Sequence, residues 1–339
     1  MKDVDIAFYT SSHDLLMNRT FTCSPSHSFA QTYLKNVRCL NRNVSVIIAS
    51  LLFFICSVTY VHADNNLSEV YEKPINNNNA PWFEVAKRNT LTFETSYGDV
   101  VIALHPTLAP THVARFKQLI NARFYDNQSF YRVIDGFVAQ AGSNDGHDKS
   151  KFDAQLLSPL NAEFTQPLSS NAQVIEDNDM FAPKTGFVDG FPVGIDEQKK
   201  EMWGLHCPGV VAFARNSEKD TASTEFYIVI GQAPRHLDRN MSVVGRVLEG
   251  MQILQKLPRG DLSQGGVLKN ITDNSKIKRA YVHNENNTPY FIQTAHHEEF
   301  KKRIQTGKHL DNPFFHDNSY GPRPIDVCYY QTKSSTSPW

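Results

Sequence analysis

The sequence has no surplus of charge of either sign, because 34 Lys and Arg residues stand against 35 Asp and Glu residues in a chain of 339. A balanced chain gives no electrostatic reason to expect binding to nucleic acid or to an anionic membrane surface. Charged residues make up 20% and aromatic residues 11% of the chain, which is typical of a globular protein and not of a disordered one. Internal repeats are also absent.

Long apolar runs are rare, and the one that stands out covers residues 44–61. Basic residues precede it, and Val61-His62-Ala63 supplies the small-residue pattern of a cleavage site, as in a secretory signal peptide. We therefore predict a leader over residues 1–63 and a periplasmic or secreted mature protein. The run is also long enough for a membrane helix of about 17–25 residues. A protein that keeps its leader and is anchored in the membrane, facing the periplasm, is the alternative.

Cysteine is scarce, with five residues, and no two of them have the CxxC spacing of a zinc or thioredoxin-type site. Without the leader, Cys207 and Cys328 are the only pair. In an oxidising compartment they could form one disulfide that closes a long loop, and two buried free thiols are the alternative. The histidines and glutamates at 296–299 lack HExxH spacing, so we expect a solvated helical face and no metal site.

Short apolar runs predict a mostly β domain over residues 82–283, after a polar spacer at 64–81. Two helices are expected at 109–120 and 250–257, the second ending at a proline. The resulting pattern favours a closed eight-stranded antiparallel barrel capped by two helices. The expected strands are 91–95, 100–104, 129–134, 137–141, 209–214, 225–230, 242–247 and 276–282.

The segment 129–142, SFYRVIDGFVAQAG, carries the most informative pattern. Asp-Gly between two alternating apolar runs predicts a β-hairpin. Strict alternation would place Arg132 on the face that Phe130 and Ile134 share, opposite Tyr131. The hairpin would then carry one cationic side chain on a face whose other side chains are apolar and expected to be buried. An edge hairpin with a solvated arginine is the alternative.

This segment resembles the core motif of the cyclophilins, the peptidyl-prolyl cis-trans isomerases. GVVAFAR at 209–215, STEFYIVIG at 223–231 and LDRNMSVVGRVLEGM at 237–251 resemble further blocks of the family, in the same order. With residues 89–125 the resemblance covers about half of the chain, and it is most similar to bacterial periplasmic members. It implies an enzyme that acts on proline-containing polypeptide clients, without a cofactor, and we expect it to be a monomer.

The implied reaction is rotation about an Xaa-Pro peptide bond, against a barrier of roughly 18–20 kcal/mol. No covalent bond is made or broken, so neither a nucleophile nor a metal is required. The twisted amide nitrogen gains a lone pair that the planar amide lacks, and a fixed cationic donor stabilises this state selectively. The resemblance assigns that donor to Arg132, in the FYRVI context.

The resemblance also assigns an apolar proline pocket and a set of polar contacts to the peptide. Gln140 would bind the substrate backbone and help to position Arg132, and Glu225 stands where glutamine is usual, which could alter the preference for residues beside proline. Ala214 and Arg215 would offer strand backbone to the residues before proline. The pocket would consist of Phe137, Val138, Tyr227 and Leu237, with Met241 at its rim.

Two further segments lie outside a compact cyclophilin barrel. Residues 143–206 are rich in polar residues, glycine and proline, with little periodicity. We expect an insertion beside the binding face, and a mobile loop more than a functional one. Residues 284–339 are expected to form an extension packed on the barrel, with a charged helix at 296–308. A non-catalytic proline-binding chaperone or scaffold, with these segments holding a partner, is the alternative to an isomerase that assists the folding of exported proteins.

Overall fold

The computed structural model describes residues 79–143, 148–177, 179–310, 312–316 and 321–338. The predicted leader and almost all of the polar spacer lie outside these residues. Across the described ranges, no helix combines the length and the apolar character needed to cross a membrane. The described chain belongs to one compact unit.

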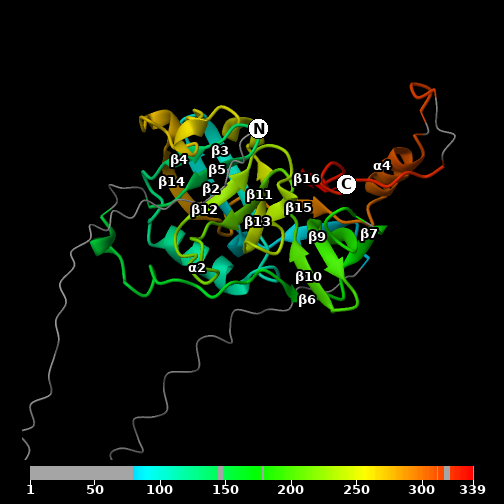
Figure 1. Ribbon diagram of the computed structural model, residues 1–339, viewed down its shortest axis with the longest axis horizontal. Helices are drawn as coiled ribbons and strands as arrows, with labels where there is room; N and C mark the ends of the chain where they lie inside the picture. The colour runs from blue at the N-terminus through cyan, green and yellow to red at the C-terminus, as the bar shows by residue number, and fades with distance from the viewer. Residues whose placement is uncertain (1–78, 144–147, 178, 311, 317–320, 339) are drawn as a thin grey trace, which may run out of the picture. The chain divides into compact units, whose positions relative to one another are not determined.

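Eight antiparallel strands form one sheet, in the order β14-β2-β3-β13-β11-β12-β5-β4 (Figure 1). The sheet nearly closes into a barrel, because Ser129, just before β4, forms a bridge with Lys276, just before β14. This architecture confirms the predicted mostly β, eight-stranded fold. The strands are β2 (Thr90–Thr95), β3 (Gly98–Leu104), β4 (Phe130–Val133), β5 (Val138–Ala141), β11 (Val210–Phe213), β12 (Phe226–Val229), β13 (Val243–Glu249) and β14 (Ile277–Val282).

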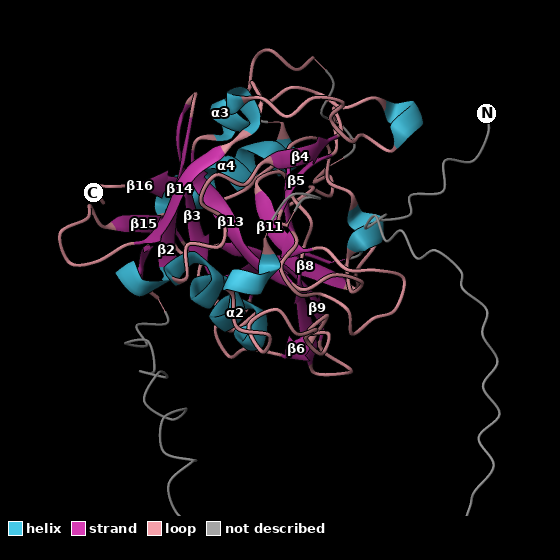
Figure 2. Ribbon diagram, turned by 90° about the vertical axis from the view of Figure 1, so that its left-hand side faces the viewer, coloured by secondary structure: helices cyan, strands magenta, loops and turns pink. Residues whose placement is uncertain are grey.

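Aromatic rings fill the barrel interior and hold its helices. Phe226 lies at the centre, with its ring centroid 5.3 Å from Phe93 and 5.0 Å from Phe116 of α2 (Pro110–Asn121). The shorter helix α3 (Met251–Leu254) packs Leu254 into the same cluster. Figure 2 shows the two helices at opposite ends of the barrel strands, as expected for a capped barrel. Five short 3-10 turns also occur in the described chain: η1 (Lys87–Asn89), η2 (Lys149–Lys151), η3 (Arg235–Leu237), η4 (Leu262–Gln264) and η5 (Asp273–Ser275).

The insertion contains a second antiparallel sheet, in the order β6-β10-β9-β8-β7, so the expectation of a mobile loop is wrong for most of its length. The missing periodicity has a physical cause, since every residue of β9 is buried and strands covered on both faces show no alternation. Gly194 on β9 lets Trp203 pack closely, because a Cβ there would lie 2.3 Å from the indole. The strands are β6 (Gln166–Pro167), β7 (Gln173–Asp177), β8 (Lys184–Val188), β9 (Phe191–Asp196) and β10 (Glu201–Gly204).

The C-terminal extension packs on this second sheet. Its helix α4 (Glu298–His309) places the Phe300 ring 5.3 Å from Phe187 of β8. A three-stranded sheet joins the start and the end of the described chain, with β15 (Tyr290–Gln293) between β1 (Trp82–Val85) and β16 (Ser334–Ser335). The extension is therefore part of the same folded body as the barrel and the insertion.

A disulfide and a buried arginine connect the barrel, the insertion and the extension. Cys207, immediately after the insertion, forms a disulfide with Cys328 of the extension, across 121 residues of sequence. Arg246 of β13 is buried and donates hydrogen bonds to the Gly190 carbonyl at 3.0 Å and to the Thr332 hydroxyl at 2.8 Å. Arg246 of the barrel therefore donates hydrogen bonds to both the insertion and the extension.

Candidate active site

The strand that carries Arg132 contains a bulge at Tyr131. Phe130 pairs with Ala141 and Arg132 pairs with Gln140, so Tyr131 is an extra residue without a partner position. Phe130 packs in the barrel core, whereas Arg132 lies with Gln140 on the outer face. The expected alternation is therefore wrong here, because one added residue reverses which face the following side chains occupy.

The Arg132 guanidinium is held by two neutral acceptors. Nη1 donates to Gln140 Oε1 at 3.0 Å, and Nε donates to the Gly265 carbonyl at 2.8 Å. The residue is 5% exposed, and burial lowers the pKa of its guanidinium. Gly265 belongs to a loop that runs beside β4, where the Val133 N–H donates to the Gly266 carbonyl at 2.9 Å. Sequence reasoning missed this loop, although its adjacent glycines, with φ values of 67° and 82°, were an available signal.

A chain of hydrogen bonds continues from Gln140 away from Arg132. The Gln140 Nε2 group donates to the Tyr131 hydroxyl at 2.7 Å, and that hydroxyl donates to Glu225 Oε2 at 2.6 Å. Glu225 Oε1 in turn accepts from the Ser143 backbone N–H at 2.6 Å. Because the amide nitrogen of Gln140 faces Tyr131, its carbonyl oxygen faces Arg132. The bulge makes this possible, since it brings Tyr131 to the same side as Arg132.

The residues of the predicted apolar pocket belong to the buried core that the outer face of the barrel forms with the insertion and the extension. Tyr227 pairs with Gln140 in the ladder between β12 and β5, so this core cluster adjoins the polar row. Phe137 is half-buried at the edge of the cluster, and its ring stacks 6.3 Å from His236. The cluster brings together five residues named from the sequence: Val138, Ala214, Tyr227, Leu237 and Met241.

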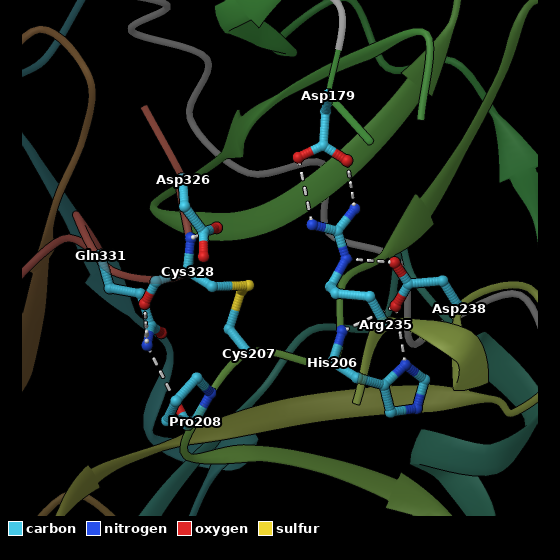
Figure 3. The surroundings of a disulfide bond; sticks show 9 residues. All are labelled: Asp179, His206, Cys207, Pro208, Arg235, Asp238, Asp326, Cys328 and Gln331. Carbon is cyan, nitrogen blue, oxygen red and sulfur yellow. Dashed lines mark hydrogen bonds and ion pairs between the residues drawn. A yellow bond between two sulfur atoms is a disulfide. The ribbon is translucent and has the colours of Figure 1, made fainter. Parts of the chain in front are cut away.

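Tyr227 has a polar partner that the sequence did not reveal. Its hydroxyl lies 2.8 Å from His206 Nε2, and His206 Nδ1 lies 3.0 Å from Asp238 Oδ1. All three groups are buried, and burial raises the pKa of the Tyr227 hydroxyl. Figure 3 shows His206 and Asp238 beside the disulfide. The Tyr227 side chain is therefore held in the cluster by hydrogen bonds as well as by packing.

The residues of the predicted peptide-binding edge form hydrogen bonds within the protein. The Ala214 N–H donates to the Glu225 carbonyl at 2.9 Å within the sheet. The Arg215 guanidinium donates to the carbonyls of Asn240 at 3.0 Å and Asn216 at 2.8 Å. The Arg215 side chain thus braces the loop after β11, and the Glu225 side chain supports Tyr131. Their part in binding a peptide stays a prediction.

Within the described ranges, no group of three or more His, Cys, Asp or Glu side chains is arranged to hold a metal ion. Cys207 and Cys328 are joined to each other. His297 caps α4 by accepting a hydrogen bond from the Glu299 N–H at 3.2 Å. These residues therefore have structural roles in the part of the chain that is described.

The geometry as a whole places a buried cationic donor beside an apolar cluster on the outer face of the β-barrel. The cluster side chains named from the sequence are at most 5% exposed, and Phe137 is the half-buried residue at the edge. Residues 90–282 match the family described as cyclophilin type peptidyl-prolyl cis-trans isomerase/CLD. The chain belongs to this family, and it is a peptidyl-prolyl cis-trans isomerase by that membership.

Individual relatives agree with this assignment. A probable peptidyl-prolyl cis-trans isomerase of Brucella suis is 30% identical over 183 residues, which are 54% of this chain and 78% of the relative. Peptidyl-prolyl cis-trans isomerase A of Dickeya dadantii is 24% identical over 196 residues, 57% of this chain and 83% of the relative. The crystal structure of cyclophilin AquaCyp293 from Hirschia baltica is 26% identical, with a TM-score of 0.59, and the match covers 75% of this chain and 92% of that one.

Proposed function

We propose that the protein isomerises Xaa-Pro bonds in unfolded or partly folded exported proteins, with Arg132 as the catalytic residue. The observation that carries this proposal is the hydrogen bond from Arg132 to Gln140, at 3.0 Å, beside the apolar cluster. An arginine held in this way is positioned before substrate arrives, so no reorganisation is needed in the transition state. The planar guanidinium can contact both the nitrogen and the carbonyl of a twisted amide.

The apolar cluster would bind the proline ring, with Phe137 as its half-exposed edge. Residues before proline would lie along Ala214 and Arg215. Because the Ala214 N–H already donates to the Glu225 carbonyl, the peptide would bond to the backbone of Arg215, the next residue along the strand end. Burial of the ring excludes water from the amide and strengthens the interaction with Arg132.

Two features support action on exported proteins. The apolar run at 44–61 has the flanks of a signal peptide, and a disulfide joins Cys207 to Cys328. Disulfides persist in oxidising compartments such as the periplasm and the extracellular space. N-terminal sequencing of the mature protein and cell fractionation test this part of the proposal. A chain that keeps residues 44–61 and sediments with membranes would favour the anchored alternative.

The test of the activity is a protease-coupled assay in which cleavage of a short peptide waits for its proline bond to become trans. We expect the protein to raise the isomerisation rate in proportion to its concentration. Binding of the same peptide should be measured in parallel by calorimetry. A rate equal to background together with intact peptide binding would favour a non-catalytic proline-binding scaffold.

A further inference from the structure

Two residues of the insertion contact Arg235, which lies beside the apolar cluster. Asp179, in the turn between β7 and β8, accepts hydrogen bonds from Arg235 Nη2 at 2.9 Å and from Nη1 at 3.3 Å (Figure 3). The Phe181 ring of the same turn lies 5.3 Å from the guanidinium carbon, within the range of a cation–π contact. The side chains of Arg235 and Asp179 are only 6% and 9% exposed. The insertion thus binds Arg235 through both a carboxylate and a ring.

Arg235 connects Asp179 to the cluster in two ways. It begins the turn η3, which ends at Leu237, so its backbone position sets that of a cluster residue. Its Nε group also donates to Asp238 Oδ2 at 2.5 Å. The other oxygen of Asp238 lies 3.0 Å from His206, whose second ring nitrogen lies 2.8 Å from the Tyr227 hydroxyl. A continuous series of hydrogen bonds therefore joins Asp179 of the insertion to Tyr227 of the cluster.

Buried charges of this kind depend strongly on one another. A carboxylate or guanidinium removed from water is costly unless its partners are in place, and the low local dielectric strengthens each remaining bond. Arg235 is held by Asp179 on one side and Asp238 on the other. Loss of the Asp179 charge would leave the buried guanidinium with fewer partners and allow η3 to shift.

The far end of the network is fixed by the extension. His206 precedes Cys207, which is joined to Cys328, so the histidine sits on a cross-linked segment. With this end held, a change at Asp179 falls mainly on η3, and so on Leu237. The turn that carries Asp179 and the cross-linked segment that carries His206 therefore contact the network at its two ends.

We propose that Asp179 is a positioning residue for proline binding, and that the insertion sets how tightly the pocket holds proline. This inference rests on the proposed function, since it takes Tyr227 and Leu237 as walls of the pocket. Asp179 acts on those walls through Arg235, and Arg132 is fixed by separate partners. Loss of the Asp179 carboxylate should therefore raise KM and the peptide dissociation constant, and change kcat little.

The experiment compares Asp179→Asn with Glu176→Gln in the full mature protein, using a proline peptide for kinetics and calorimetry. Glu176 is a matched control on the same insertion, because it pairs with Lys308 of the extension at 3.2 Å and its side chain is 13% exposed. We expect Asp179→Asn to raise KM and Kd by about fivefold, with kcat within about twofold of wild type. Glu176→Gln should leave KM unchanged, even where it lowers the melting temperature. Asp179→Glu, which restores the charge, should recover part of the loss.

Phe181→Ala provides a second route that does not depend on the folding of Asp179→Asn, because Phe181 is 47% exposed. It should raise KM in the same direction, by about twofold. Unchanged KM in both variants, in a protein that is active and loses activity in Arg132→Ala, would overturn this inference and leave the proposed function standing. A wild-type rate at background would instead overturn the proposed function. An equal rise of KM in Glu176→Gln would show a general loss of stability and would also overturn the inference.

Discussion

Tyr131 donates a hydrogen bond of 2.6 Å to the buried carboxylate of Glu225, and its oxygen accepts one of 2.7 Å from Gln140. The direction of these bonds settles which end of the Gln140 amide faces Arg132. Without the tyrosine hydroxyl, the amide could rotate and present its nitrogen to the guanidinium, donor against donor. The geometry of Arg132, the proposed catalytic residue, therefore depends on a residue that does not contact the peptide in the proposed complex.

Tyr131→Phe removes this hydroxyl and keeps the ring. We expect kcat/KM to fall by about two- to twelvefold, because one net hydrogen bond is worth about 0.5–1.5 kcal/mol. Tyr281→Phe is the matched control, since Tyr281 lies on β14 and stacks on His283, 5.8 Å away. Equal kcat/KM for the two variants in the protease-coupled assay would show that Tyr131 does not position Gln140.

Glu225 should make the stability of the protein depend on pH in an unusual direction. Burial raises its pKa, although its bonds to Tyr131 and Ser143 and the charge of Lys149 act the other way. The folded state therefore keeps this proton at pH values where the unfolded chain has released it. The contribution of Glu225 to the free energy of unfolding falls as the pH rises from about 4.3, its value in the unfolded chain, through the raised pKa.

Glu225→Gln removes this titration and leaves the other carboxylates in place. Relative to wild type, the free energy of unfolding of the variant should rise with pH across that window. Urea unfolding of both proteins at several pH values between about 4 and 8 measures the difference. A difference that stays constant with pH would mean that the pKa of Glu225 is not raised.

Reduction of the Cys207–Cys328 disulfide should destabilise the protein without abolishing the active site. The bond closes a loop of 121 residues, and loss of a native disulfide typically costs about 2–5 kcal/mol. Thermal unfolding with and without dithiothreitol measures this cost. The double variant Cys207→Ser with Cys328→Ser is the control and should not respond to the reductant. Equal melting temperatures for oxidised and reduced wild type would show that the cross-link adds no stability.

Removal of Arg246 should destabilise the protein, because this buried arginine joins the barrel, the insertion and the extension. Arg246 is 8% exposed, and burial lowers its pKa to about 10. Arg246→Leu leaves Gly190 and Thr332 without this donor, and we expect a loss of about 2–4 kcal/mol. Arg279→Leu is the control, since its side chain is 61% exposed, and we expect a change within about 0.5 kcal/mol. Similar losses for the two variants in urea unfolding would contradict this role.

The barrel could be predicted because its strands and turns leave local signals. Asp135-Gly136 between apolar runs predicts the hairpin, and the structure has β4 and β5 on either side of it. The bulge at Tyr131 could not be predicted, since counting alternate residues cannot detect one that is added. The second sheet was missed for a related reason, because β9 is buried along its whole length and shows no period.

The partners of the site residues were harder still to predict. Resemblance to the cyclophilins named Arg132 and Gln140, and the structure places them in contact. The bonds that Asp179 forms with Arg235 join positions 56 residues apart, and no local pattern links them. Long-range contacts of this kind depend on how the insertion folds, which the sequence did not show.

The ratio of kcat/KM between wild type, Arg132→Lys and Arg132→Ala, measured in the protease-coupled proline assay, tests the role of the guanidinium. Removing one preorganised transition-state donor typically costs about 10²–10³-fold, so we expect a loss of at least about 10²-fold in Arg132→Ala. Arg132→Lys should keep part of the activity, because it keeps the charge without the planar fork. Wild-type activity in Arg132→Ala, with peptide binding unchanged, would show that another group stabilises the twisted amide.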